Sequence, residues 1–186
     1  VERIRDGRSF AARRVEGFQN GKRTVIMSVS FHHDQDSGPE HATAMPDVPG
    51  AEESVDHVKF RPQSAKKRAL DWTDWDIRVV PNEKLSEDLL NPAGQATHQY
   101  LWIKNTSDMG NDQGVHQAAL AYLSDMTLLY TTLLDHENPD IQAASLDHAM
   151  WFLRPVRVDE WLLIDQYSPS AGSGIGLSKG NVYNQR

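Results

Sequence analysis

The chain has 186 residues and a formal net charge of −7, from 19 basic and 26 acidic side chains. It contains no cysteine, which excludes disulfide scaffolds, thiolate zinc sites and cysteine nucleophiles. The acidic balance argues against nucleic-acid binding, because that binding depends on phosphate neutralisation by Lys and Arg. No apolar stretch approaches the roughly 20 residues of a membrane-spanning helix, and no residue pattern indicates a cofactor or a metal site.

The first 33 residues predict β structure. Residues 9–19 and 22–31 form two arms around Asn20-Gly21, the dipeptide favoured in two-residue hairpin turns. In the second arm, apolar residues alternate with mainly polar ones: Val25, Met27, Val29 and Phe31 against Thr24, Ile26, Ser28 and Ser30. A period of two predicts a strand with one buried face.

Residues 34–70 predict a linker. Residues 34–58 are rich in Pro, Gly and acidic side chains and show no periodicity, which is typical of a loop. Residues 66–68 add three adjacent basic side chains on a polar stretch. We therefore expect an acidic connecting segment before a second block that starts near Asp71.

The second block predicts one long helix among several strands. The helix covers residues 114–135, with Asn111 or Asp112 as its N-terminal cap and residues 136–139 as its stop. Its apolar stripe is Val115, Ala118, Ala119, Tyr122, Met126, Leu129, Tyr130 and Leu133. Strands are predicted over residues 75–80, 97–104, 143–153, 161–167 and 175–183, with a short helix over 83–90. A long helix wrapped by a sheet is an α+β arrangement.

Asp147 is the titratable residue with the most unusual context. It lies in an otherwise apolar run that predicts a strand, and burying a carboxylate costs free energy unless the group is paired or used. One interpretation is a structural Asp that accepts backbone hydrogen bonds. The other is a general base whose pKa is raised by the sheet around it. The residues alone leave both open.

The glycine-rich stretch at residues 168–176 does not support a phosphate-binding loop. Such a loop must open a helix, whereas the residues that follow predict a strand. We interpret the stretch as a loop or bulge between two strands.

Several motifs together resemble one enzyme family. Residues 146–155 read LDHAMWFLRP and residues 160–163 read EWLL; RDGRSF at 5–10, QNG at 19–21, VHQ at 115–117 and AYLSD at 121–125 also match. On these motifs the chain resembles the type II acyl-CoA thioesterases, which include bacterial thioesterase II and peroxisomal acyl-CoA thioesterases. The resemblance covers nearly the whole chain apart from the linker.

The resemblance implies a double hotdog, in which a curved antiparallel sheet wraps around a long helix in each of two copies. Residues 1–33 would be the closing strands of the first copy, and residues 71–186 the second copy without its last strand. The implied reaction is hydrolysis of an acyl-CoA to fatty acid and CoA. Exposed sheet edges suggest a homo-oligomer. The implied compartment is the cytoplasm for a bacterial protein and the peroxisome for a eukaryotic one, and no targeting signal is visible.

The family's catalytic residues are an Asp, a Ser or Thr, and a Gln that together activate a water molecule. By resemblance Asp147 matches the Asp, and Ser168 matches the hydroxyl, with Ser170 as the fallback. The family Gln belongs to a strand that would follow Arg186. We add a hypothesis that backbone N–H groups of Gly114 and Val115, at the helix start, polarise the thioester carbonyl.

Two other functions remain as alternatives. One is a hotdog module that binds acyl-CoA or assembles partners without hydrolysis. The other is an acyl-CoA dehydratase on a related fold, which typically uses a histidine on the helix. His116 occupies that helix, but its sequence context matches the thioesterases.

Overall fold

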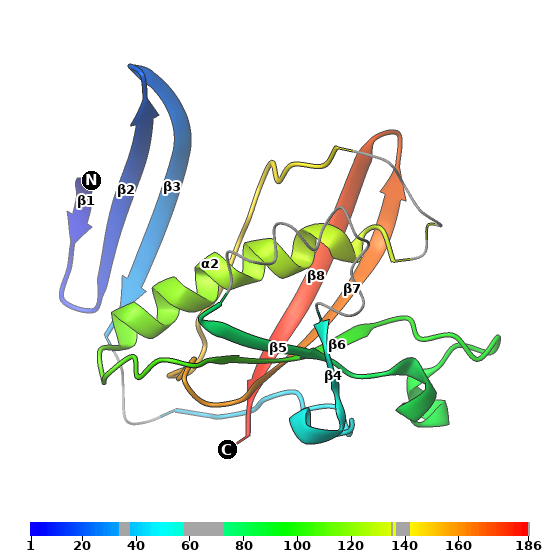
Figure 1. Ribbon diagram of the computed structural model, residues 1–186. Helices are drawn as coiled ribbons and strands as arrows, with labels where there is room; N and C mark the ends of the chain where they lie inside the picture. Colours follow the sequence, from blue (N-terminus) through cyan, green and yellow to red (C-terminus); the bar gives the residue numbers. More distant parts are fainter. Residues whose placement is uncertain (34–37, 58–72, 135, 137–141, 186) are drawn as a thin grey trace. The chain divides into compact units, whose positions relative to one another are not determined.

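The computed structural model describes residues 1–33, 38–57, 73–134, 136 and 142–185. The chain forms two compact units, Val1–Ala44 and Met45–Arg186, and each unit has its own sheet (Figure 1). Residues 58–70 of the predicted linker and the predicted helix stop at 137–139 lie outside the described residues.

The first unit is an antiparallel sheet of three strands in the order β1-β2-β3. The strands are β1 (Glu2–Asp6), β2 (Phe10–Gln19) and β3 (Lys22–His32). Asn20 and Gly21 have φ angles of 51° and 73°, as a tight hairpin turn of the favoured type requires. The predicted hairpin is therefore confirmed, and the short charged strand β1 is an addition that its sequence did not reveal.

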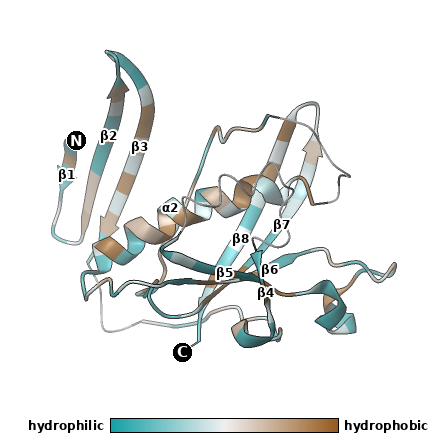
Figure 2. Ribbon diagram, in the orientation of Figure 1, coloured by the Kyte–Doolittle hydropathy of each residue, from teal (hydrophilic) through white to brown (hydrophobic). Residues whose placement is uncertain are grey.

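The apolar side chains of β3 are exposed within this unit. Hydrophobic and hydrophilic residues alternate along the strand (Figure 2), yet Val25, Met27 and Phe31 all remain exposed. The prediction of a buried face is therefore wrong for the described structure of this unit. The physical reason is that the unit is one sheet layer, and a sheet buries a face only against a second layer.

The second unit contains an antiparallel sheet in the order β4-β5-β6-β7-β8. Its strands are β4 (Val55–Asp56), β5 (Trp75–Val79), β6 (Gln99–Asn105), β7 (Leu162–Gly172) and β8 (Ile175–Asn184). The strands predicted over 75–80, 97–104, 161–167 and 175–183 are thus confirmed. The glycine-rich stretch is the β7–β8 hairpin, with positive φ at Ser173 and Gly174, and not a phosphate loop.

Part of the range predicted as linker packs on this sheet. Ala51, in the 3₁₀ turn η1 (Ala51–Glu53), is buried, and the indole Nε1 of Trp102 donates to the carbonyl of Pro49 over 2.8 Å. Arg78 adds a hydrogen bond of 2.9 Å to the carbonyl of Ala51. The short helix predicted over residues 83–90 is two 3₁₀ turns, η4 (Asn82–Lys84) and η5 (Glu87–Leu89).

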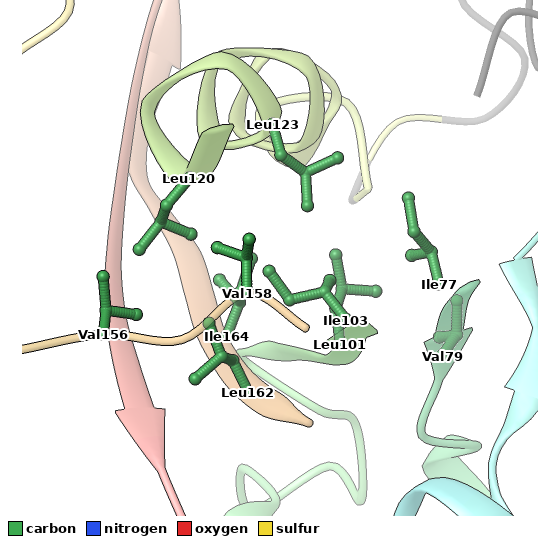
Figure 3. Close-up of a cluster of buried hydrophobic side chains, with 10 residues drawn as sticks. All are labelled: Ile77, Val79, Leu101, Ile103, Leu120, Leu123, Val156, Val158, Leu162 and Ile164. Carbon is green, nitrogen blue, oxygen red and sulfur yellow. The ribbon is translucent and has the colours of Figure 1, made fainter. Parts of the chain in front are cut away.

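The long helix α2 (Gln113–Thr131) packs on β7 and β8 (Figure 1). Asp112 caps it, because its side chain accepts a hydrogen bond from the N–H of Gly114. Leu120 and Leu123 point from α2 toward apolar side chains of the sheet (Figure 3). The core cluster comprises Ile77, Val79, Leu101, Ile103, Leu120, Leu123, Val156, Val158, Leu162 and Ile164.

The buried face of α2 differs from the predicted stripe. Three members of that stripe, Val115, Ala118 and Tyr122, are exposed, Tyr122 by 56%. The residues that are buried are His116, Leu120, Leu123, Ser124, Thr127 and Thr131. Small hydroxyl side chains on this face allow a close approach to the sheet. At the helix end, a Cβ added to Gly176 of β8 would lie 2.6 Å from Thr132.

Side chains of α2 hydrogen-bond the segment that leads into β7. The amide of Gln113 both donates to and accepts from the backbone of Val156, at 3.1 and 3.0 Å. His116, fully buried, accepts at Nδ1 from the N–H of Val158 over 3.2 Å, and its Nε2 lies 3.0 Å from the carbonyl of Gly110. Because Nδ1 is an acceptor, the proton must be on Nε2, and both ring nitrogens are engaged with backbone.

The strand predicted over residues 143–153 does not form. Residues 142–155 have no regular secondary structure, and Leu146 and Trp151 are 87% and 77% exposed. The residues have strand-forming composition, but the strand that follows them in sequence, β7, already pairs with β6 on one side and β8 on the other. The segment therefore cannot pair with β7. Strand propensity depends on such a partner.

Within the described residues, no helix is long and apolar enough to cross a bilayer. The edges of the second sheet are β4 and β8. Pairing of such an edge between subunits stays a prediction.

His116→Ala is expected to lower the free energy of unfolding by about 2–4 kcal/mol, because it opens a cavity and leaves buried backbone groups without partners. Urea denaturation measures the change. Tyr122→Ala, on the exposed side of the same helix, is the control and should cost within about 0.5 kcal/mol. A larger loss for Tyr122→Ala than for His116→Ala would contradict the assignment of the buried face.

Candidate functional site

Asp147 lies on the exposed segment 142–155, not inside a strand. Two residues that follow it make contacts: Nε2 of the exposed His148 lies 3.0 Å from the hydroxyl of Ser124, and the half-buried Met150 packs against the core. Asp147 itself is exposed, and no hydrogen bond joins it to Ser168 or Ser170 in the described part of the chain. The expected burial of this carboxylate is therefore wrong, and the carboxylate is open to water.

Ser168 lies at an irregularity in β7. The register between β7 and β8 shifts between Tyr167 and Ser170, so β7 carries one extra residue there. The hydroxyl of Ser168 donates to the carbonyl of Leu177 on β8 over 2.9 Å, which fixes its orientation. Its proton is then committed, and its lone pairs remain available as acceptors. Ser168 is half-buried, whereas Ser170 is exposed.

The start of α2 already has acceptors for its first N–H groups. The N–H of Gly114 donates to the side chain of Asp112 over 2.8 Å, and the N–H of Val115 donates to the carbonyl of Asp112 over 3.1 Å. A substrate carbonyl would have to displace the Asp112 carboxylate to reach Gly114. The charge on that carboxylate also opposes a developing oxyanion nearby.

The candidate residues fall on three separate segments that α2 contacts or includes. Ser124 of α2 meets the segment of Asp147, and Thr132 lies against Gly176 of β8, next to the residue that holds Ser168. No hydrogen bond links Asp147, Ser168 and Gly114 to one another among the described residues. Helix α2 is therefore the common support of the predicted site residues.

A buried carboxylate does occur in an apolar strand, at Asp165 of β7. It follows Leu162–Ile164, is only 6% exposed, and is hydrogen-bonded to Nδ1 of His98. The His98 ring stacks on Tyr167, with ring centroids 4.5 Å apart. The reasoning that singled out Asp147 applies to Asp165, which had the same signal in its sequence and was missed.

Two tyrosines beside Asp165 are shifted in their titration. Burial, and then the negative charge of Asp165, raise the pKa of Tyr100 to about 12. Burial and Asp165 also raise the pKa of Tyr183, partly offset by a hydrogen bond that the Asn181 side chain donates to the Tyr183 oxygen. Both effects favour neutral tyrosine next to a buried carboxylate.

Gln166 is a second polar residue within β7 that sequence reasoning missed. It is fully buried, and its Nε2 donates to Oε1 of Gln99 over 2.8 Å. Its own Oε1 has no hydrogen-bond partner among the described residues. Within that same part of the chain, no group of three His, Asp or Glu side chains is placed to hold a metal ion.

Comparison with known proteins places this geometry in a family. The family model for acyl-CoA thioesterase matches residues 66–186. Acyl-coenzyme A thioesterase 8 of Mus musculus is 34% identical over 200 residues, covering 98% of this chain and 61% of that protein. The chain belongs to the acyl-CoA thioesterase family. It spans less than two thirds of the length of this mouse relative.

Solved structures of similar proteins carry the fold. The crystal structure of an acyl-CoA thioesterase II from Mycobacterium marinum is 40% identical, has a TM-score of 0.82, and is covered over 66% of its length by 99% of this chain. A hot dog fold protein from Alicyclobacillus acidocaldarius is 18% identical, with a TM-score of 0.65, and 99% of this chain covers 65% of it. The predicted α+β hotdog fold is thereby confirmed, while the assignment of residues 1–33 to a first copy stays a prediction.

Membership in the thioesterase family also bears on the dehydratase alternative. That alternative needs His116 to reach a substrate. The imidazole is instead fully buried, with both ring nitrogens hydrogen-bonded to backbone. His116 is a structural residue of α2.

The stability of the protein is expected to fall between pH 10 and pH 12. Unfolded tyrosine loses its proton near pH 10, whereas folded Tyr100 keeps it until about pH 12. The free energy of unfolding should therefore drop by up to about 1.4 kcal/mol per pH unit for this residue. Urea denaturation at pH 9.5 and pH 11 measures the difference.

Tyr100→Phe should reduce this alkaline loss, and Tyr122→Phe, at an exposed tyrosine, is the matched control. An identical pH dependence in the wild type and in Tyr100→Phe would show that Tyr100 ionises equally in the folded and unfolded chains.

Proposed function

We propose that the protein hydrolyses acyl-CoA thioesters to free fatty acid and CoA. The observation that carries this proposal is the family match over residues 66–186, together with 34–40% identity to thioesterases along nearly the whole chain. The LDHAMWFLRP segment that carries Asp147 lies inside that match.

In the proposed reaction Asp147 is the general base. Its carboxylate takes a proton from a water molecule, and the water oxygen attacks the thioester carbonyl carbon. The tetrahedral intermediate then collapses, the C–S bond breaks, and the sulfur leaves as CoA thiolate, which is protonated by the Asp147 carboxyl group or by solvent. A base contributes typically 10²–10⁴-fold to such a step. The exposure of Asp147 supports access of water to the carboxylate.

Ser168 is proposed to orient the attacking water. Its hydroxyl proton is engaged with Leu177, so its oxygen can accept a hydrogen bond from water while the strand bulge holds it in place. This fixed geometry favours Ser168 over the exposed Ser170. The proposed role of Gly114 and Val115 requires the Asp112 side chain to move away from the helix start when substrate binds.

Asp147→Ala and Asp147→Asn in the full-length natural protein are each expected to lower kcat/KM by at least about 100-fold, because neither side chain can accept the proton. Ser168→Ala should give a loss of about tenfold or more. Release of free CoA from acyl-CoAs of graded chain length measures turnover. Asp74→Ala, at another exposed carboxylate, is the control and should keep full activity.

Two results would contradict the proposal in different ways. Full turnover in Asp147→Ala would remove Asp147 as the base while leaving a thioesterase. Binding of acyl-CoA by the wild type without any CoA release would instead support a non-catalytic acyl-CoA-binding module.

A further inference from the structure

The contact between Ser124 and His148 is the most specific link between α2 and the segment of Asp147. Ser124 is buried on the helix, and its Oγ lies 2.9 Å from the carbonyl of Ala121 and 3.0 Å from Nε2 of His148. A hydroxyl has one proton to donate. When that proton bonds the Ala121 carbonyl, the imidazole must donate its Nε2–H to the serine oxygen.

A second contact extends the same attachment. The sulfur of Met150 lies 4.0 Å from Oγ of Ser124, and Met150 also packs against the apolar core. His148 and Met150 are two residues apart, and both contact Ser124. Asp147 immediately precedes His148 and is exposed, as are His148 itself and Trp151. The contact with Ser124 therefore attaches the segment to α2 one residue away from the Asp147 carboxylate.

The other buried hydroxyls on this face behave differently. Thr127 donates to the carbonyl of Ser124 over 3.2 Å, and Thr131 donates to the carbonyl of Thr127 over 3.4 Å. Their hydrogen bonds stay within α2, as is common for Ser and Thr in helices. Ser124 differs because its hydroxyl also reaches a side chain 24 residues away along the chain.

We propose that Ser124 is a positioning residue: its hydrogen bond to His148 holds residues 142–155 on α2 and thereby fixes the place of the Asp147 carboxylate. The proposal rests on the proposed catalytic role of Asp147. A base acts only within hydrogen-bond reach of its water, and small displacements of a catalytic group cost large factors in rate. Ser124 would act on the reaction through His148 without contacting substrate.

The kinetic test compares Ser124→Ala with the full-length wild type. Alanine keeps the helix and removes only the hydroxyl. We expect kcat to fall about tenfold with KM changed less than about twofold, because orientation of the base is lost and substrate binding is not. Thr131→Val is the matched control, because it removes a buried hydroxyl whose hydrogen bond stays within α2, and it should leave kcat unchanged.

Variants of His148 test whether the effect passes through the imidazole. His148→Ala should lower kcat by about the same factor as Ser124→Ala, and the double variant should add no further loss. His148→Gln should restore most of the rate, because its amide N–H can reach the serine oxygen. Additive losses in the double variant, or no rescue by glutamine, would overturn the proposed route.

Limited chymotrypsin cleavage provides a readout that does not depend on activity. Leu146 and Trp151 are exposed cleavage sites on the segment. Ser124→Ala should speed cleavage there several-fold, and Thr131→Val should not, because cleavage follows local opening of the attached segment. An unchanged cleavage rate in Ser124→Ala overturns the positioning proposal even if the wild type is a thioesterase.

Failure of the proposed function has its own signature. A wild type that releases no CoA overturns the thioesterase assignment, and with it any catalytic purpose for positioning Asp147. Faster cleavage together with an unchanged kcat in Ser124→Ala would show that the attachment exists and that the rate does not depend on it, which also overturns the proposal.

Discussion

The second unit depends on how the first turn of α2 is fastened to the chain that enters β7. A helix lying on a sheet with shared apolar contacts alone could slide or rotate, because hydrophobic attraction is non-directional. Here Gln113 and His116 bond the backbone of Val156 and Val158, so the helix is fixed in register and rotation. Leu120 and Leu123 then fall onto Ile103, Val158 and Ile164, as Figure 3 shows.

The same fastening explains the polar composition of the buried helix face. Since directional bonds set the position of α2, the remaining buried positions do not all need large apolar side chains. The hydroxyl groups of Ser124, Thr127 and Thr131 donate hydrogen bonds to carbonyl groups of the helix itself. These short side chains keep the buried face of α2 close to the helix axis. The end of the helix consequently lies close to Gly176 of β8. The oxygen of Ser124 can still accept a hydrogen bond from His148.

Sequence patterns predicted most of the architecture and less of the site. The hairpin at Asn20-Gly21, the strands β5 to β8 and the helix cap at Asp112 depend on local chemistry, which is written in a few adjacent residues. The strand over 143–153 failed because a strand needs a partner, and pairing is a property of the whole sheet. The buried face of α2 was predicted wrongly because the apolar stripe was taken as the buried side. The helix instead buries His116 and three hydroxyl residues, Ser124, Thr127 and Thr131, together with Leu120 and Leu123.

The candidate site was predicted by resemblance more than by environment. Asp147 and Ser168 were identified from matching motifs, whereas the argument from an apolar surrounding fitted Asp165 and its partner His98. That partner lies 67 residues away in sequence, and no local pattern could connect the two. The contact of Ser124 with His148 is hidden in the same way, because each residue alone reads as an ordinary polar side chain.

The enclosed imidazole of His116 has a consequence for spectroscopy. Its Nε2 proton is held against the Gly110 carbonyl and the ring is shielded completely from solvent. Exchange of that proton with water requires α2 to move away from the sheet. In a proton NMR spectrum the ring N–H of His116 should therefore persist as a separate downfield resonance, and its lifetime would report directly how often α2 detaches from the sheet.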